Sequence, residues 1–346
     1  MENKKQKALC ILVVAVICGS IIAFYERGGQ KVYAQVKEQA SVKEAQNPQP
    51  QAAAPAKVYF TSDISPEALI TVYNALERKP DNATISSGKV AVKINTGEPP
   101  HSNYLRVDLI KNLVQSVNGT IVECNTAYAG QRSSTAMHMQ VIKDHGYTAI
   151  AKVDIMDADG SIALPVRGGT VLQENLVGSH FKNYDYFIIL SHFKGHSMAG
   201  LGGAIKNMAI GIASQEGKAW IHSGGTSKTD PWGGAQDAFL DGMAEAAKSV
   251  ADGLNGRILY ISVMNRLSVD CDCDGNPAEP DMHDIGVLSS LDPVALDQAC
   301  VDLVYKATDG KSLIQRMESR DGIKAINHGA EIGLGSKAYE LINLNG

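Results

Sequence analysis

Residues 186–196 read YFIILSHFKGH, and this stretch decides the fold class. The apolar run at its start is too short for a helix and has the composition of a strand buried on both faces, as in a parallel sheet. A serine, two histidines and a lysine follow directly, where the strand is expected to end. The stretch therefore predicts a central strand with polar side chains at its carboxyl end.

Strand and helix signals alternate on both sides of this stretch. Apolar runs predict further strands at 89–94, 120–124 and 258–263. Helical spacing of apolar residues predicts helices at 104–117, 134–145 and 235–251, and prolines at 66 and 293 are typical of helix starts. This order predicts an α/β fold in one large domain, with a mostly parallel sheet and helices on both faces. In such sheets, ligands bind beyond the carboxyl ends of the strands.

The first 57 residues differ from the rest of the chain. Three lysines precede an uncharged run at 8–25, which is typical of an export signal. We expect residues 1–34 to be a signal peptide cleaved after Ala34, or a retained membrane anchor. Residues 35–57, rich in Gln, Ala and Pro, are expected to be a disordered linker before the domain at 58–346. The protein is thus expected outside the cytoplasm, secreted or anchored in the membrane.

Composition narrows the range of partners. The chain has 346 residues, of which 44% are apolar and 20% charged, as in an ordinary soluble domain. Its net charge of −5 and its scattered lysines and arginines provide no basic footprint. We therefore expect no nucleic-acid partner.

The end of the quoted stretch is the first candidate site. If residues 192–196 turn helically, His192 and His196 share one face and are able to hold a divalent metal, with Lys194 between them. The alternative is a polar loop whose histidines bond to backbone groups.

A glycine-rich turn follows as the second candidate. Gly202 and Gly203 allow backbone N–H groups to approach an anion closely, with Lys206, Asn207 and, further along, Lys218 available to bind it. The turn has neither the nucleotide-binding glycine pattern nor a Walker loop. A turn that serves only helix–sheet packing explains the glycines equally well.

The third candidate is the segment DCDCDG at 270–275, with Asp281 and His283 shortly after it. A disulfide between residues two apart is uncommon. Two thiolates from Cys271 and Cys273, with the imidazole of His283, suit zinc, iron or a cluster. A calcium loop is the rival interpretation, although the aspartate spacing does not complete an EF-hand.

Two further residues follow other predicted strands. Glu98 lies after the strand at 89–94, where an acid or base is useful, and Arg132 is suited to clamp an anionic substrate.

Together these segments resemble a prokaryotic family known as domain of unknown function 362, often labelled iron–sulfur-centre proteins. The resemblance rests on the sequences VKI at 92–94, LSHFKGH at 190–196, GGAIKN at 202–207, CDC at 271–273 and SLDPVA at 290–295. It runs in order from about residue 58 to the end.

The resemblance implies an α/β domain with a metal or iron–sulfur cofactor. Several family members carry a ferredoxin-like insert, but residues 218–237 here contain no cysteine. The family also often has histidine where Asn95 stands. The spacing of residues 192–206 is distantly similar to the nickel-dependent lactate racemase group.

The leading hypothesis is an exported enzyme of redox or isomerase type that depends on a metal ion or iron–sulfur cluster and acts on a small anionic molecule. Its expected metal ligands are His192, His196, Cys271, Cys273 and His283. The expected catalytic residues are Glu98, Lys194, Lys206 and Asp281. The expected substrate-binding residues are Arg132, Gly202, Gly203, Asn207 and Lys218. One alternative is a non-catalytic protein that captures a metal or metal complex, and another is a structural zinc site.

Overall fold

The computed structural model describes residues 13–17, 20–27, 30–35 and 54–345, which fall into two compact units, Met1–Ala53 and Ala54–Gly346. In the first unit, antiparallel strands are formed by β1 (Val13–Ile17), β2 (Ser20–Arg27) and β3 (Gln30–Gln35). These strands contain the described part of the predicted signal peptide or anchor, and β3 also includes Gln35, the first residue of the predicted linker. Most of the predicted linker lies outside the described residues, and its last four positions, 54–57, belong to the second unit. None of the helices in the described ranges combines the length and hydropathy of a membrane span.

The second unit is built on one eight-stranded sheet. Its strands lie in the order β15 (Tyr339–Asn343), β4 (Ala56–Thr61), β14 (Gly286–Ser290), β13 (Ile258–Met264), β10 (Tyr186–His192), β5 (Val90–Lys93), β6 (Thr120–Glu123), β7 (Val153–Ile155). Only β14 runs against its two neighbours, and every other pair is parallel. The predicted mostly parallel sheet is confirmed.

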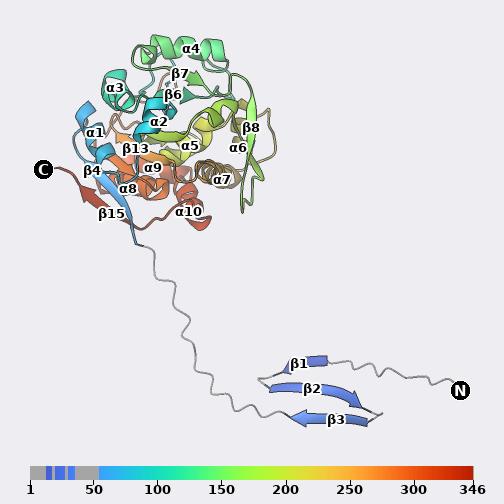
Figure 1. The fold of residues 1–346 in the computed structure, drawn as a ribbon. Helices are drawn as coiled ribbons and strands as arrows, with labels where there is room; N and C mark the ends of the chain where they lie inside the picture. Colours follow the sequence, from blue (N-terminus) through green and yellow to red (C-terminus); the bar gives the residue numbers. More distant parts are fainter. Residues whose placement is uncertain (1–12, 18–19, 28–29, 36–53, 346) are drawn as a thin grey trace. The chain divides into compact units, whose positions relative to one another are not determined.

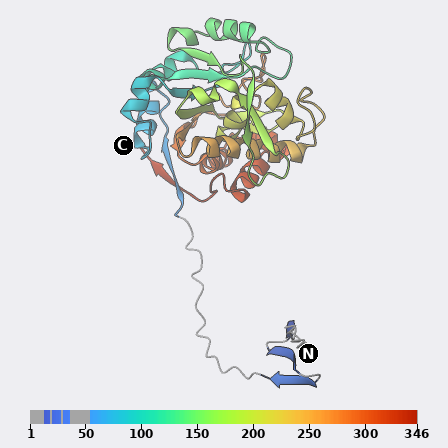
Figure 2. The same cartoon turned by 45° about the vertical axis from the view of Figure 1, so that its right-hand side comes forward.

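The central strands are apolar because both faces of the sheet are covered. Every residue of β10 and β13 is buried. One face is covered by α1 (Pro66–Ala75), α2 (Asn82–Ser87), α3 (Val107–Ser116) and α4 (Thr135–Asp144). The other is covered by α5 (Ala204–Ile212), α6 (Gln215–His222), α7 (Gln236–Leu254), α8 (Pro293–Lys306), α9 (Lys311–Ser319) and α10 (Ile323–Glu331). Figures 1 and 2 show these two layers in views 45° apart.

Two helices that the sequence indicated by their prolines begin at side-chain caps. Ser65 accepts the N–H of Ala68 at the start of α1, and Asp292 accepts those of Val294 and Ala295 at the start of α8. Both helices have proline in the first turn, whose missing N–H needs no partner there.

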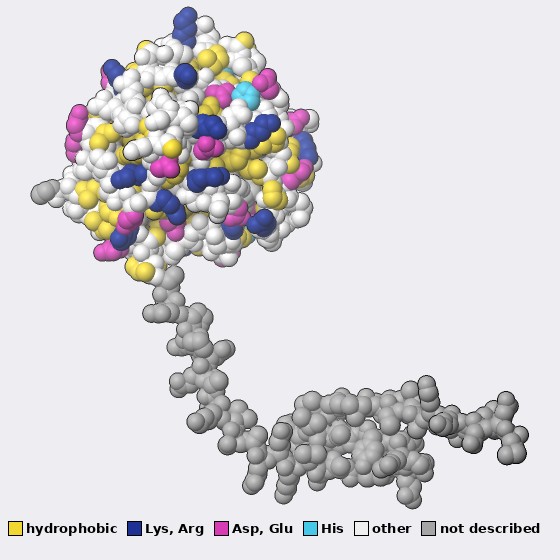
Figure 3. Space-filling model, viewed as in Figure 1, with side chains coloured by type: hydrophobic (Ala, Val, Ile, Leu, Met, Phe, Trp, Pro, Cys, Tyr) yellow, Lys and Arg dark blue, Asp and Glu magenta, His cyan; other side chains and the backbone are white. Residues whose placement is uncertain are grey.

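Acidic and basic side chains are interspersed over the face seen in Figure 3.

The order of the strands identifies one special place at the edge of the sheet. From β5 the chain steps outward to β6 and β7, and it then returns to β10 on the other side of β5 and continues to β13 and β14. The direction of progress therefore reverses between β5 and β10. Ligands of open α/β sheets bind at the carboxyl edge of such a switch point.

Candidate functional site

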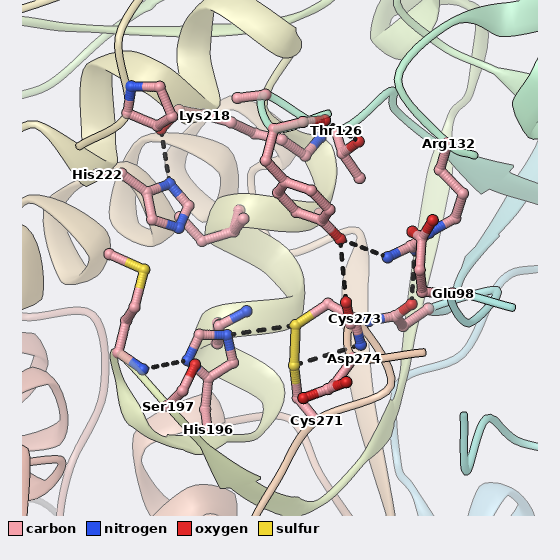
Figure 4. A pocket seen from close by; sticks show the side chains of 18 of the residues that line it. Glu98, Thr126, Arg132, His196, Ser197, Lys218, His222, Cys271, Cys273 and Asp274 are labelled. Atoms are coloured by element: carbon pink, nitrogen blue, oxygen red, sulfur yellow. Dashed lines mark hydrogen bonds and ion pairs between the residues drawn. A yellow bond between two sulfur atoms is a disulfide. The ribbon is translucent and has the colours of Figure 1, made fainter. Parts of the chain in front are cut away.

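A cavity of about 450 Å³ opens beside this switch point, and Figure 4 shows it from close by. This volume suits a small molecule. Eight of the predicted site residues line the cavity, namely Glu98, Arg132, His196, Lys206, Asn207, Lys218, Cys271 and Cys273. The other six predicted residues lie outside its wall, namely His192, Lys194, Gly202, Gly203, Asp281 and His283.

The segment that carries the two predicted histidine ligands is extended, which corrects the idea of a helical turn. β10 runs on to His192, and the chain then pairs as β11 (Lys194–His196) with β12 (Gly200–Gly202). Gly195 packs so tightly that a Cβ there would lie 2.2 Å from the carbonyl oxygen of Val269. The two imidazoles are therefore not stacked on one helical face.

His192 and Lys194 both bind Asp272, which is fully buried in the middle of the Cys-x-Cys loop. His192 Nδ1 lies 3.1 Å from the Asp272 carboxylate, and its Nε2 lies 2.6 Å from the carbonyl oxygen of Asn265. Both ring nitrogens are directed at buried protein groups and not at the cavity, so this arrangement does not present His192 as a metal ligand. Burial alone would raise the pKa of Asp272, but His192 and Lys194 lower it well below its usual value. This cluster anchors the loop from behind and leaves His192 and Lys194 outside the cavity.

His196, Cys271 and Cys273 form a group of the type that can hold a metal, with ligand atoms within 4.8 Å of one another. In this structure the two sulfurs are joined in a disulfide. His196 Nδ1 accepts the N–H groups of Met198 and Ala199, each at 3.0 Å, so the proton of the neutral ring is on Nε2. A disulfide offers no thiolate, and a protonated Nε2 offers no lone pair. The oxidised group does not fit a metal or cluster, and metal binding stays a prediction for the reduced chain.

Asp281 and His283 lie on the surface beyond the loop. His283 Nδ1 is 2.8 Å from the carboxylate of Asp309, and Asp281 accepts the hydroxyl of Ser312. Both side chains are exposed. Since neither lines the cavity, the structure does not bring them to His196 and the cysteines.

The glycine turn leads into α5, but the first amides of that helix are already occupied. Asp297 accepts the N–H groups of Ala204 at 2.7 Å and Ile205 at 2.9 Å. A Cβ on Gly203 would lie 2.3 Å from the same carboxylate, which explains the glycine. The amides that were expected to bind an anion after Gly202 and Gly203 are thus occupied by the protein's own carboxyl group.

Arg132 and Glu98 form an ion pair with one another and hydrogen bonds with other residues of the cavity wall (Figure 4). The guanidinium donates to Glu98 at 2.8 Å, to Asn95 at 2.9 Å and to the Tyr128 hydroxyl at 2.9 Å. Glu98 also accepts the N–H of Gln131 at 2.8 Å. With only 3% of Arg132 exposed, the pair shapes the wall, and little of it is left to clamp a substrate or move a proton.

A second buried ion pair lies at the floor of the cavity and was not predicted. Lys93, at the end of β5, donates to Glu123 at 2.8 Å and to Asn207 at 3.1 Å. The Asn207 amide in turn donates to the carbonyl oxygens of Lys93 and Leu190, which ties β5 to β10. A lysine that closes the apolar run of β5 was the available sequence signal, because a buried charge requires a partner.

The Glu123 pair predicts acid sensitivity. Burial opposes ionisation, but Lys93 and the other nearby cations outweigh it and lower the pKa of Glu123 from 4.5 to about 2. A carboxyl group whose pKa is lower in the folded chain than in the unfolded chain stabilises the fold at pH values above its unfolded-state pKa. This stabilisation is lost as the pH falls toward the folded-state pKa. We expect the free energy of unfolding to drop by on the order of 3 kcal/mol between about pH 4.5 and 2, measured by denaturant titration. Glu123→Gln should be less stable at neutral pH and should flatten this window, and an unchanged acid profile would contradict the assignment.

Lys206 and Lys218 are the cavity cations that lack a carboxylate partner within the described ranges. Lys218 donates to the carbonyl oxygens of Cys124 and Ala213, which leaves one of its three N–H groups unused. Lys206 makes no side-chain hydrogen bond to any described residue. Burial and then the cations Lys194, Lys93, Arg132 and Lys218 lower the pKa of Lys206 from 10.5 to about 7.

His222 is a cavity residue to which the sequence analysis gave no role. Its Nδ1 donates to the carbonyl oxygen of Lys218 at 2.7 Å (Figure 4). Its ring also stacks on Phe239. Burial and then Lys206 lower the pKa of His222 to about 4, so the ring is neutral with a lone pair on Nε2. A histidine on the same helix face as Lys218, four residues later, was the signal that could have indicated it.

The sequence matches a family model described as a domain of unknown function, DUF362, over residues 90–302. The chain belongs to this family. The matched residues include β5 and β10 at the switch point, the glycine turn and the Cys-x-Cys loop of this DUF362 protein. None of the curated proteins matches the sequence.

Distant similarities to solved structures include the following two. The lactate racemase apoprotein from Thermoanaerobacterium thermosaccharolyticum is 14% identical, with a TM-score of 0.38, 70% of this chain covered and 55% of that one. A Thermotoga maritima protein is 12% identical, with a TM-score of 0.37, 77% of this chain covered and 58% of that one. The chain thus spans little more than half the length of either protein.

Proposed function

We propose that this DUF362 protein is an enzyme that binds a small anionic molecule in the cavity and moves a proton on it through Lys206. The observation that carries the proposal is Lys206 itself, an ammonium group in the cavity wall without a carboxylate partner among the described residues. In keeping with its N-terminal sequence, we propose that the enzyme acts outside the cytoplasm.

The electrostatics of the cavity support an anionic substrate. Lys206 and Lys218 both line it, and neither charge is balanced by a carboxylate within the described ranges. Removing such charges from water is costly unless a counter-ion is present. A small carboxylate or a similar anion supplies that counter-ion.

The acidity of Lys206 supports proton transfer. A group with a pKa of about 7 is present in both forms at neutral pH, which is the condition for efficient general acid–base catalysis. A bound anion raises the pKa of Lys206, and when the anion loses its negative charge the pKa of Lys206 falls again. The Nε2 lone pair of His222 is a second proton acceptor in the same wall.

The proposal is tested by calorimetry and isotope exchange. We expect oxalate to bind the full chain and its affinity to fall at least tenfold, about 1.4 kcal/mol, in Lys206→Met. Short-chain carboxylic acids incubated with the enzyme in D₂O should exchange a carbon-bound proton, as followed by NMR. Lys206→Arg should keep oxalate binding and lose the exchange. Failure of the parent chain to bind oxalate or any acid in the panel would refute the proposal.

A second candidate function is the non-catalytic capture of a metal or metal complex, favoured by the His196, Cys271 and Cys273 group. In that case the reduced chain should bind a stoichiometric metal that survives in Lys206→Met, and no acid should exchange its protons. The two candidates are therefore separated by the same pair of variants.

A further inference from the structure

The disulfide in the cavity wall has a hydrogen-bond donor at each sulfur. The backbone N–H of Cys273 donates to Cys271 Sγ at 3.3 Å, and His196 Nε2 lies 3.6 Å from Cys273 Sγ. The orientation of His196 is set by the two amides that its Nδ1 accepts, so Nε2–H points at sulfur (Figure 4). Donors in these positions stabilise the thiolates that would form if the bond were broken.

A structural staple is a poor explanation for this bond. A bridge between residues two apart closes a very short loop, so it removes little entropy from the unfolded chain. The loop is also anchored independently, because Asp272 between the cysteines binds His192 and Lys194 in the interior. The bond faces the cavity instead of joining distant parts of the fold.

We propose that Cys271 and Cys273 are a thiol–disulfide redox couple that accepts two electrons from a dithiol entering the cavity. This inference does not rest on the proton transfer assigned to Lys206. It does follow from the same geometry that makes the oxidised group a poor metal site.

The exposure of the two sulfurs decides which of them is attacked. Cys273 is partly exposed, whereas Cys271 is 5% exposed, so a thiolate of the dithiol attacks Cys273 Sγ. The S–S bond breaks, and Cys271 Sγ leaves with the electron pair as a thiolate that accepts the Cys273 N–H. The mixed disulfide joins Cys273 Sγ to the first sulfur of the dithiol. The second thiolate of the dithiol then attacks that first sulfur. Cys273 Sγ leaves as a thiolate that accepts Nε2–H of His196, both thiolates take up the two protons released by the dithiol, and the dithiol ends as a disulfide.

The surroundings favour this exchange. His196 Nδ1 accepts the N–H groups of Met198 and Ala199, so Nε2–H is the donor that faces the sulfur. Lys206 lines the same cavity as the two sulfurs, and a cation there favours negative charge at sulfur.

The first test equilibrates the full chain with reduced and oxidised dithiothreitol and reads the Cys271–Cys273 peptide by mass spectrometry after thiol trapping. We expect this peptide to interconvert reversibly between disulfide and dithiol while circular dichroism shows a folded chain throughout. A bond that opens only when the chain unfolds would overturn the proposal, since it would be a staple. Two thiols with a stoichiometric metal in the chain as purified, without reductant, would also overturn it.

The second test separates the two sulfurs and the histidine. His196→Gln should slow reduction by dithiothreitol about tenfold, the effect of one lost hydrogen bond to a charged group. His180→Gln, at a half-buried histidine that lies outside the cavity wall and binds Asp154 and Asp159, is the matched control and should reduce at the parent rate. Oxidised glutathione should capture Cys273 in Cys271→Ser at least about tenfold faster than Cys271 in Cys273→Ser, because attack requires access. Equal rates for both histidine variants, or faster capture of Cys271, would refute the proposed order of steps.

Discussion

Replacing Lys206 with methionine should raise the free energy of unfolding at pH 7 by roughly 4 kcal/mol, in the same variant whose affinity for oxalate falls. The reason is the lowering of the Lys206 pKa on folding, from 10.5 to about 7, which burial causes first and the neighbouring cations reinforce. The folded chain holds this ammonium in a place that disfavours its charge. Denaturant titration of the two chains measures the difference.

The sign of the effect follows from proton binding. Between about pH 7 and 10.5 the unfolded chain holds a proton on Lys206 that the folded chain lacks, so stability falls as the pH drops through this window. Below pH 7 the folded chain bears the full free-energy cost of the buried Lys206 charge, and above about pH 10.5 this cost vanishes. The gain of the variant should therefore be largest at neutral and acidic pH and absent above about pH 10.5.

A matched control identifies the origin of the gain. Lys111 is exposed on α3, and Lys111→Met should change stability by less than about 0.5 kcal/mol. A stabilised Lys206 variant that no longer binds oxalate indicates a site whose function is maintained at the expense of stability. A destabilised Lys206 variant would show that the ammonium has a partner, and would remove the observation on which the proposed function rests.

The fold could be predicted from the sequence because its signals are local. The apolar run at 186–190 has too few residues for a helix, and the caps at Ser65 and Asp292 precede prolines. Each of these features acts within one element, so no knowledge of the neighbours is needed. The position of the site at the carboxyl edge follows from the same pattern.

The roles of individual residues could not be predicted, because they depend on contacts between distant segments. Nothing local in the sequence shows that Asp272 turns inward to His192 and Lys194, or that Asp297 occupies the amides after Gly203. The protonation of the His196 ring is set by two amides in the following turn. The residue types indicated which functional groups lie at the carboxyl edge of the sheet. The hydrogen-bond and ion-pair partners of each side chain decide whether it remains free to bind a ligand.

Asp272→Asn should lower the free energy of unfolding by about 3–5 kcal/mol, the usual cost of removing one partner from a buried charge pair. Asp272 is fully buried and is the carboxylate that compensates Lys194, which is itself only 3% exposed. An amide oxygen accepts a hydrogen bond but does not neutralise an ammonium. Asp274→Asn, on the exposed side of the same loop, is the control and should change stability by less than about 0.5 kcal/mol.

A double-variant cycle tests whether the loss comes from the uncompensated charge. Lys194→Met in the Asp272→Asn background removes the orphaned ammonium, so the double variant should be more stable than Asp272→Asn alone. The cycle is measured by denaturant titration of all four chains. If Asp272→Asn costs less than about 1 kcal/mol, or if the two changes simply add, the buried cluster does not anchor the Cys-x-Cys loop. In that event the disulfide would be left as the element that shapes the loop, and the argument that the loop is anchored without the disulfide would no longer support its assignment as a redox couple.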